Sequence, residues 1–141
     1  MRNYLLLILM VIAVPAQAAE WGLTGALVAG GPSLEAGGAV LHPLGKRALA
    51  ADVTLGVARG YRTVAASAAW QNKPEPGWFY AWGLRNEWVF DHGAVEPRLG
   101  LTGEFGWQGE APNRIRVGFK PMLFILGIGP AVSLNVSVFP W

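Results

Sequence analysis

Apolar and polar side chains alternate along almost the whole chain after residue 20. Between residues 49 and 57, for example, Leu49, Val53 and Val57 alternate with small or polar residues such as Asp52. A period of two is typical of β-strands, because successive side chains point to opposite faces of a sheet. The pattern predicts eight strands, at residues 21–27, 34–40, 49–57, 64–70, 78–90, 95–107, 115–125 and 132–138.

Short segments rich in Gly, Pro, Asn and Asp separate these strands, for example at residues 59–61 and 91–93. Short connections throughout imply that each strand pairs with the next one in sequence. Eight strands of about ten residues close a small barrel and cross a bilayer at a tilt. The sequence therefore predicts an all-β fold, an eight-stranded antiparallel up-and-down transmembrane β-barrel with short turns.

The two faces of the predicted strands differ sharply in charge. The alternate set that contains the large apolar residues holds no Asp, Glu, Lys or Arg, and its one strongly polar member is Asn86. A charge at mid-depth on a lipid-facing surface costs about 2–4 kcal/mol, so we expect this face to contact lipid. One alternative stays open: a soluble periplasmic β-barrel with the apolar face turned inward to bind an apolar ligand.

Charges enclosed in a narrow barrel are expected to pair, because an isolated buried charge is costly. If residues 91–94 form a hairpin, Glu87 lies opposite Arg98, and Glu104 can meet Arg116 across the next turn. We predict a lumen filled by side chains in place of an open channel. The expected network comprises Asp52, Arg85, Glu87, Glu96, Arg98, Glu104, Arg114, Arg116 and Lys120.

Tryptophan is favoured at both interfaces of a bilayer, where the ring is half buried and its N–H stays hydrated. In an up-and-down barrel most of the tryptophans fall near the end that carries the termini. The sequence predicts an aromatic rim at the lipid interface, formed at that end by Trp21, Trp70, Trp78, Trp107 and Trp141 and at the opposite end by Trp88.

The first 18 residues have the three parts of a secretory signal peptide. Arg2 precedes an unbroken apolar run at residues 5–14, and small residues at 16 and 18 predict cleavage after Ala18. Residues 19–141 then form one β-barrel domain. Export through a cleaved signal peptide predicts the outer membrane, with the periplasm as the alternative.

With this signal, the eight alternating segments and the aromatic end Phe139-Pro140-Trp141, the chain resembles the small eight-stranded outer-membrane barrels of the OmpA and OmpX type. The resemblance covers the whole mature chain in pattern. It implies insertion by the barrel-assembly machinery and contact with outer-membrane lipids and lipopolysaccharide. Because no spacing along the chain forms a catalytic, metal or nucleotide site, we expect a non-enzymatic structural, envelope-stability or surface-interaction role. In that group the terminal aromatic residue belongs to the outward-facing set. Here Phe139 and Trp141 fall in the same alternate set as Asn135, which is the set expected to face inward.

Composition narrows the other possibilities. Charged residues make up 14% of the chain, against about 25% in soluble domains, and the formal net charge of +2 reflects a near balance of signs. Nucleic acid is therefore not an expected partner. With two histidines and no cysteine, the sequence predicts no metal site and no cofactor. It does not specify an oligomeric state.

Two surface pairs carry weaker hypotheses. Asp91 and His92 are the candidates for a lipid A-modifying hydrolase, the less favoured alternative function, although no serine lies near them in sequence. Arg59 and Arg62 flank a predicted outer turn, where a guanidinium could contact a glycolipid phosphate.

Overall fold

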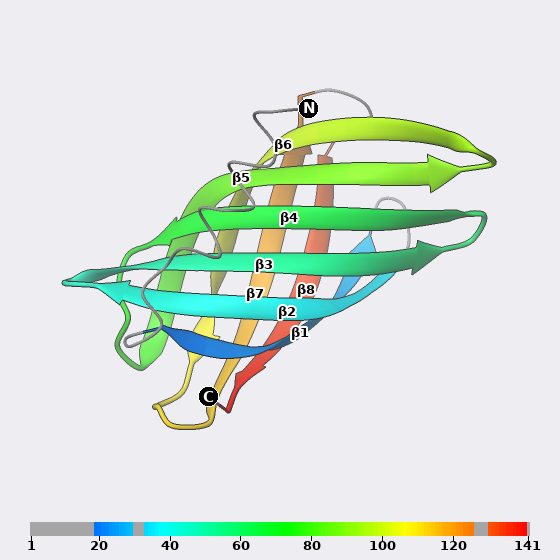
Figure 1. Cartoon of the computed structure of the whole chain (residues 1–141). Helices are drawn as coiled ribbons and strands as arrows, with labels where there is room; N and C mark the ends of the chain where they lie inside the picture. The colour runs from blue at the N-terminus through cyan, green and yellow to red at the C-terminus, as the bar shows by residue number, and fades with distance from the viewer. Residues whose placement is uncertain (1–18, 30–32, 126–129, 141) are drawn as a thin grey trace.

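The computed structural model of the chain describes residues 19–29, 33–125 and 130–140, which form a closed antiparallel barrel (Figure 1). Each strand pairs with the next in sequence, and β8 pairs with β1 to close the ring. The eight-stranded up-and-down fold predicted from the alternation is confirmed. Its strands are β1 (Glu20–Ala29), β2 (Ser33–Leu44), β3 (Arg47–Ala58), β4 (Tyr61–Gln71), β5 (Gly77–Asp91), β6 (Ala94–Gln108), β7 (Arg114–Phe124) and β8 (Pro130–Phe139).

The antiparallel order gives the barrel two distinct ends. We call the end where β1 starts and β8 finishes the terminal end, and the opposite one the distal end. The β3–β4 and β5–β6 turns at the distal end are tight, with φ of 96° at Gly60, 45° at His92 and 86° at Gly93. Positive φ at both central residues is the hairpin geometry that matches the twist of paired strands, so the β5–β6 turn extends a regular ladder.

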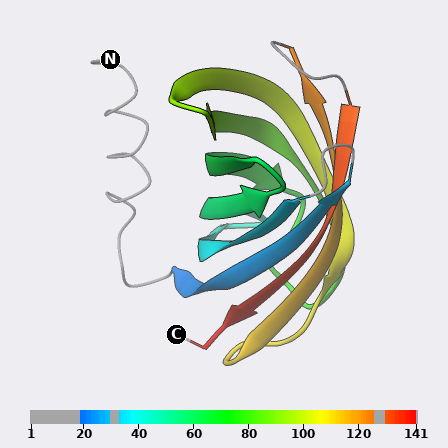
Figure 2. The ribbon, with the colours of Figure 1, turned by 90° about the vertical axis from the view of Figure 1, so that its right-hand side faces the viewer.

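The pairing register fixes the stagger of the barrel. The stagger is found by moving from each residue to its register partner on the next strand until the path has gone once around the barrel. Starting at Phe105 on β6, the path ends at Val95, ten residues away on the same strand. The residues on the way are Phe119, Leu134, Leu27, Leu34, Val57, Arg62 and Phe90. A stagger of this size in eight strands corresponds to a strand tilt of about 40°. Figure 2 shows the strands following one another around the wall.

Two inward-facing glycines show how tightly the wall bends. A Cβ at Gly37 would overlap the Val53 carbonyl of the neighbouring strand, and one at Gly83 would overlap the Ala68 carbonyl. Any larger residue at these positions would push the strands apart, so glycine is required where the neighbouring backbone comes this close.

The two faces of the wall follow the predicted alternation. Along β6, Leu101, Phe105 and Trp107 are exposed on the outside, whereas Thr102 and Glu104 are buried inside. The alternative of an inward apolar face that binds an apolar ligand is therefore wrong. Polar side chains line the interior because the alternating register turns them inward on every strand. No helix among the described residues is long and apolar enough to cross a membrane.

Candidate functional site: a charged lumen within an apolar wall

A buried cluster of alternating charge fills the distal half of the lumen. Arg85 Nη2 lies 2.5 Å from Glu35 Oε1 and 3.0 Å from Glu87 Oε2, and these three residues are nearly inaccessible to solvent. Arg98 continues the cluster, with Nη1 3.6 Å from Glu87 Oε1 and Nε 3.2 Å from Glu96 Oε1. Glu96 is more than half exposed, so the cluster runs from the middle of the barrel to its distal mouth.

A second pair lies in the middle of the lumen. Lys120 Nζ on β7 is 3.1 Å from Asp52 Oδ2 on β3, a contact that crosses the interior. Ser67 donates a hydrogen bond of 2.5 Å to the same carboxylate oxygen. Asp52 is thus compensated by a cation from the opposite wall and a hydroxyl from its own side.

The third pair depends on a glycine. Arg116 Nη2 lies 2.7 Å from Glu104 Oε2, and its guanidinium sits 4.2 Å above the centre of the Phe79 ring. The pairs on either side of Glu104, Thr102 with Met122 and Phe105 with Phe119, put it across from Lys120, so its side chain leans over Gly118 to reach Arg116. Gly118 offers the necessary space because it has no side chain of its own.

The terminal end is closed by another ion pair. Arg114 holds Glu20 through two contacts, Nε to Oε2 at 2.8 Å and Nη2 to Oε1 at 3.0 Å. Its Nη1 also donates to the carbonyl of Gly109 at 2.9 Å. This forked contact joins β7 to the first strand of the barrel and to the β6–β7 loop.

Two fully buried glutamines tie the β4–β5 loop to the lumen. Gln71 Nε2 donates to Gln108 Oε1 at 2.9 Å and to the carbonyl of Lys73 at 2.6 Å. Gln108 Nε2 donates to the carbonyl of Glu75 at 2.7 Å. Because both side chains face inward, the loop they bind is drawn toward the terminal mouth.

All nine residues predicted for the lumen network lie on the inward face in the structure and make ion pairs there. No partner was predicted for Arg85 or Lys120, and the predicted network did not include Glu20 or Glu35. Glu35 pairs with Arg85 from β2 to β5, across the lumen, where the register of neighbouring strands carries no information. The two glutamines were also missed, because a neutral side chain leaves no charge pattern.

The space between these side chains is small. A cavity of about 30 Å³ near the distal end is lined by Tyr61, Thr63 and Phe124, among others, and one of about 20 Å³ lies beside Asp52 and Asn135. Each has room for about one water molecule. At these two places the charged and polar side chains of the lumen leave little room between them.

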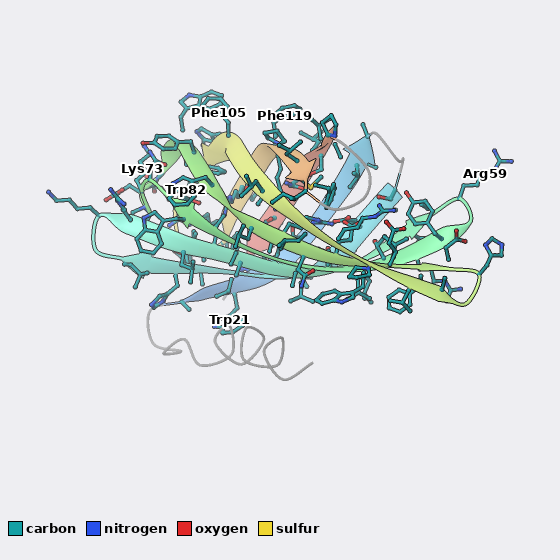
Figure 3. The ribbon with its side chains drawn as sticks, turned by 90° about the horizontal axis from the view of Figure 1, so that it is seen from above. Trp21, Arg59, Lys73, Trp82, Phe105 and Phe119 are labelled. Carbon is teal, nitrogen blue, oxygen red and sulfur yellow. The ribbon has the colours of Figure 1, made fainter. Side chains whose placement is uncertain are left out.

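Aromatic side chains crowd the outside of the wall toward the terminal end. Trp21, Trp78 and Trp107 are exposed there, and Trp70 is partly exposed beside Trp82. The rings of Trp78 and Phe105 stack with centroids 5.4 Å apart and planes 13° apart. Figure 3 shows Trp21, Trp82, Phe105 and Phe119 pointing away from the barrel.

The remaining rim residues are placed as follows. Trp88 is partly exposed on the outward face of β5, in the distal half, and Trp141 lies outside the described residues, as does the predicted signal peptide at residues 1–18. Trp82 was not among the predicted rim residues, although it is 66% exposed. It follows Tyr80 in the same alternate set, and its depth depends on the stagger between strands.

The two surface pairs lie at the distal end. His92 Nδ1 contacts Asp91 Oδ1 within the β5–β6 turn, and both side chains are largely exposed. No hydroxyl nucleophile is hydrogen-bonded to His92 among residues 19–29, 33–125 and 130–140. Arg59 and Arg62 are exposed at the β3–β4 turn, and no group of three metal-ligating side chains occurs in the described chain.

No protein-family model matches the chain, and no curated protein matches it. Solved structures that share its fold include a bacterial surface protein and a designed barrel. Neisserial surface protein A superposes with a TM-score of 0.60 and 11% sequence identity, over 87% of this chain and 96% of that one. A de novo designed transmembrane β-barrel gives a TM-score of 0.52 at 11% identity, over 88% and 97% of the two chains.

The likeness to Neisserial surface protein A spans nearly the whole of both chains, so the shared unit is the complete barrel. At 11% identity it extends to the fold alone. It supports a small barrel of the outer-membrane type and does not single out the OmpA and OmpX type.

Proposed function

We propose that the chain is a non-enzymatic outer-membrane β-barrel with a structural, envelope-stability or surface-interaction role. One observation carries the proposal: the protein is apolar outside and charged inside. The outward positions Leu23, Leu55, Leu84 and Ile115 are each at least half exposed, whereas the charges of the lumen are buried in pairs. A surface of this kind is stable in lipid and would aggregate in water.

The few outward-facing charges lie where a bilayer tolerates them. Arg47 begins β3 and Arg62 is the second residue of β4, so both are at strand ends, near opposite ends of the barrel. A basic residue costs about 2–4 kcal/mol at the midplane of a bilayer and much less near its interfaces. The outward strand positions between these ends, in the described part of the wall, contain no charged residue.

The aromatic rim supports the same placement. Trp21, Trp78 and Trp107 gather near one end of the wall, as expected for an interface with headgroups. If that end faces the periplasm, the distal turns face outward and are short. Long external loops are then not available for adhesion, which favours a role for the wall and the rims.

A filled lumen argues against a role as a diffusion pore. Arg85, Arg116 and Lys120 occupy the interior with their acidic partners, and the β4–β5 loop is bound at the terminal mouth. We expect the purified protein to give no large steady conductance in a planar bilayer. Insertion by the barrel-assembly machinery and contact with lipopolysaccharide belong to this proposal.

The proposal is tested by fractionation and gel mobility. We expect the protein to sediment with the outer membrane and to migrate differently on SDS gels with and without boiling, as a closed barrel does. Release by osmotic shock, or a mobility unchanged by heating, would contradict the proposal.

A further inference from the structure

We propose that Arg59 and Arg62 form a phosphate-binding site at the distal rim, which holds the phosphorylated headgroup of a glycolipid in the adjoining leaflet. The inference rests on the proposed membrane location. Beyond that location, it assigns the distal rim to the binding of phosphorylated glycolipid.

Arg59 and Arg62 differ from the arginines of the lumen in having no ion-pair partner among the described residues. Each cation on the inward face has a carboxylate partner within 4 Å, for instance Arg98 and Arg114. The side chains of Arg59 and Arg62 are exposed and make no hydrogen bond or ion pair with any described residue. Their charges are thus available to a ligand from outside the chain.

Position along the wall favours a ligand that is polar at one end and apolar at the other. Arg59 occupies the β3–β4 turn beside Gly60, and in Figure 3 it extends beyond the end of the barrel. Arg62 stands on the outward face between its register partners Val57 and Phe90, both of which are exposed. The pair therefore lies where the apolar wall ends.

The nearby acidic groups do not compete for these charges. Asp91 follows Phe90 but belongs to the inward register and contacts His92 within its own turn. Glu96 is bonded to Arg98. On the outward face of the described strands there is no carboxylate that could neutralise Arg62.

Guanidinium groups suit phosphate because their N–H donors match its oxygens in pairs. Two arginines separated by a tight turn can share the charge of one phosphate, while Val57 and Phe90 contact the apolar part of the lipid. A free phosphate ion has no apolar part and would gain nothing from Val57 and Phe90. The combination points to a phosphorylated lipid.

The chain contains a matched control at its other end. Lys46 lies in the β2–β3 turn after Gly45, and Arg47 follows on the outward face, so the terminal rim also has two exposed basic residues at a tight turn. The variants R59Q/R62Q and K46Q/R47Q remove equal charge at opposite ends. If the distal rim meets the glycolipid leaflet, only the first variant loses the ligand.

The test is native mass spectrometry of protein extracted in mild detergent from isolated outer membranes. We expect wild type and K46Q/R47Q to carry bound glycolipid, and R59Q/R62Q to carry about tenfold less or lower still, since each basic residue contributes several-fold to the binding of an anionic lipid. Retained glycolipid in R59Q/R62Q, or equal loss in both variants, would overturn the site.

A second arm separates the two sources of phosphate. Delipidated wild-type protein is titrated with inorganic phosphate and, separately, with glycolipid in detergent micelles. We expect saturable binding of the glycolipid alone, and equal binding of inorganic phosphate would overturn the lipid assignment. Absence of wild type from the outer-membrane pellet would instead refute the proposed function, and this site with it.

Discussion

The carboxylate of Glu104 occupies the space that a side chain at Gly118 would fill. A Cβ at Gly118 would lie 2.9 Å from Glu104 Cδ and 3.0 Å from its Cγ, so the whole end of the Glu104 side chain lies over the glycine. This position brings Glu104 to Arg116, two residues along β7. A residue without a side chain thus determines which cation the glutamate pairs with.

We expect Gly118→Ala to destabilise the barrel, because a Cβ there displaces the end of the Glu104 side chain and weakens its pair with the buried Arg116. Complete loss of a buried pair costs about 3–5 kcal/mol, which sets the upper limit of the effect. The measurement is the free energy of unfolding by urea in lipid vesicles. Gly103→Ala is the control, since a Cβ there would lie at an ordinary van der Waals distance of 3.6 Å from its nearest neighbour, Pro121 Cγ. Equal stability of the two variants would contradict the role assigned to Gly118.

Removal of Arg85 should be among the most damaging changes in the lumen. Arg85→Met leaves Glu35 and Glu87 without this cation, and breaking a buried pair costs about 3–5 kcal/mol. The triple variant E35Q/R85M/E87Q removes the uncompensated charges and should recover much of the loss. Urea unfolding of both variants in the same vesicles decides the question, and a triple variant no more stable than Arg85→Met would refute the explanation.

The stacked rings of Trp78 and Phe105 should be coupled energetically. A double-mutant cycle with alanine is expected to give a coupling of about 0.5–1.5 kcal/mol, the range for aromatic pairs in this geometry. Leu84 and Leu101, register partners on the same two strands, provide the comparison cycle and should couple more weakly. Similar values in the two cycles would show that stacking adds nothing to wall stability.

The exposed pair at the β5–β6 turn is expected to have no catalytic part. His92→Ala should leave the lipid A profile of the cells unchanged, because no described nucleophile is hydrogen-bonded to His92. Mass spectrometry of lipid A from cells with wild-type protein, His92→Ala or no protein makes the comparison. A modification present in wild type and lost in His92→Ala would establish the enzyme alternative.

The features of this barrel that could be predicted from the sequence are those that depend on residues close together along the chain. Alternation predicted the eight strands, and the short β5–β6 turn placed Glu87 opposite Arg98, because a tight hairpin fixes the register of the strands it joins. The register of Phe139 with Asn135 was also predicted, and Phe139 is buried on the inward face.

Contacts across the lumen could not be predicted in the same way. Glu35 and Arg85 are on strands that do not pair, and their meeting depends on the stagger and curvature of the whole wall. The attachment of the β4–β5 loop by Gln71 and Gln108 depends on the same closure. Each of these contacts forms only when the ring is complete.

The central claim, that the outward face contacts lipid, is tested most directly by spin labels on β6. The chain has no cysteine, so single cysteines at Leu99, Leu101 and Phe105, and at the inward Gly100 and Thr102, can each carry one label. In vesicles we expect high accessibility to oxygen and low accessibility to a water-soluble nickel complex at the three outward positions, and low accessibility to both at the two inward ones. Outward labels that collide readily with the nickel complex would contradict a wall in contact with lipid.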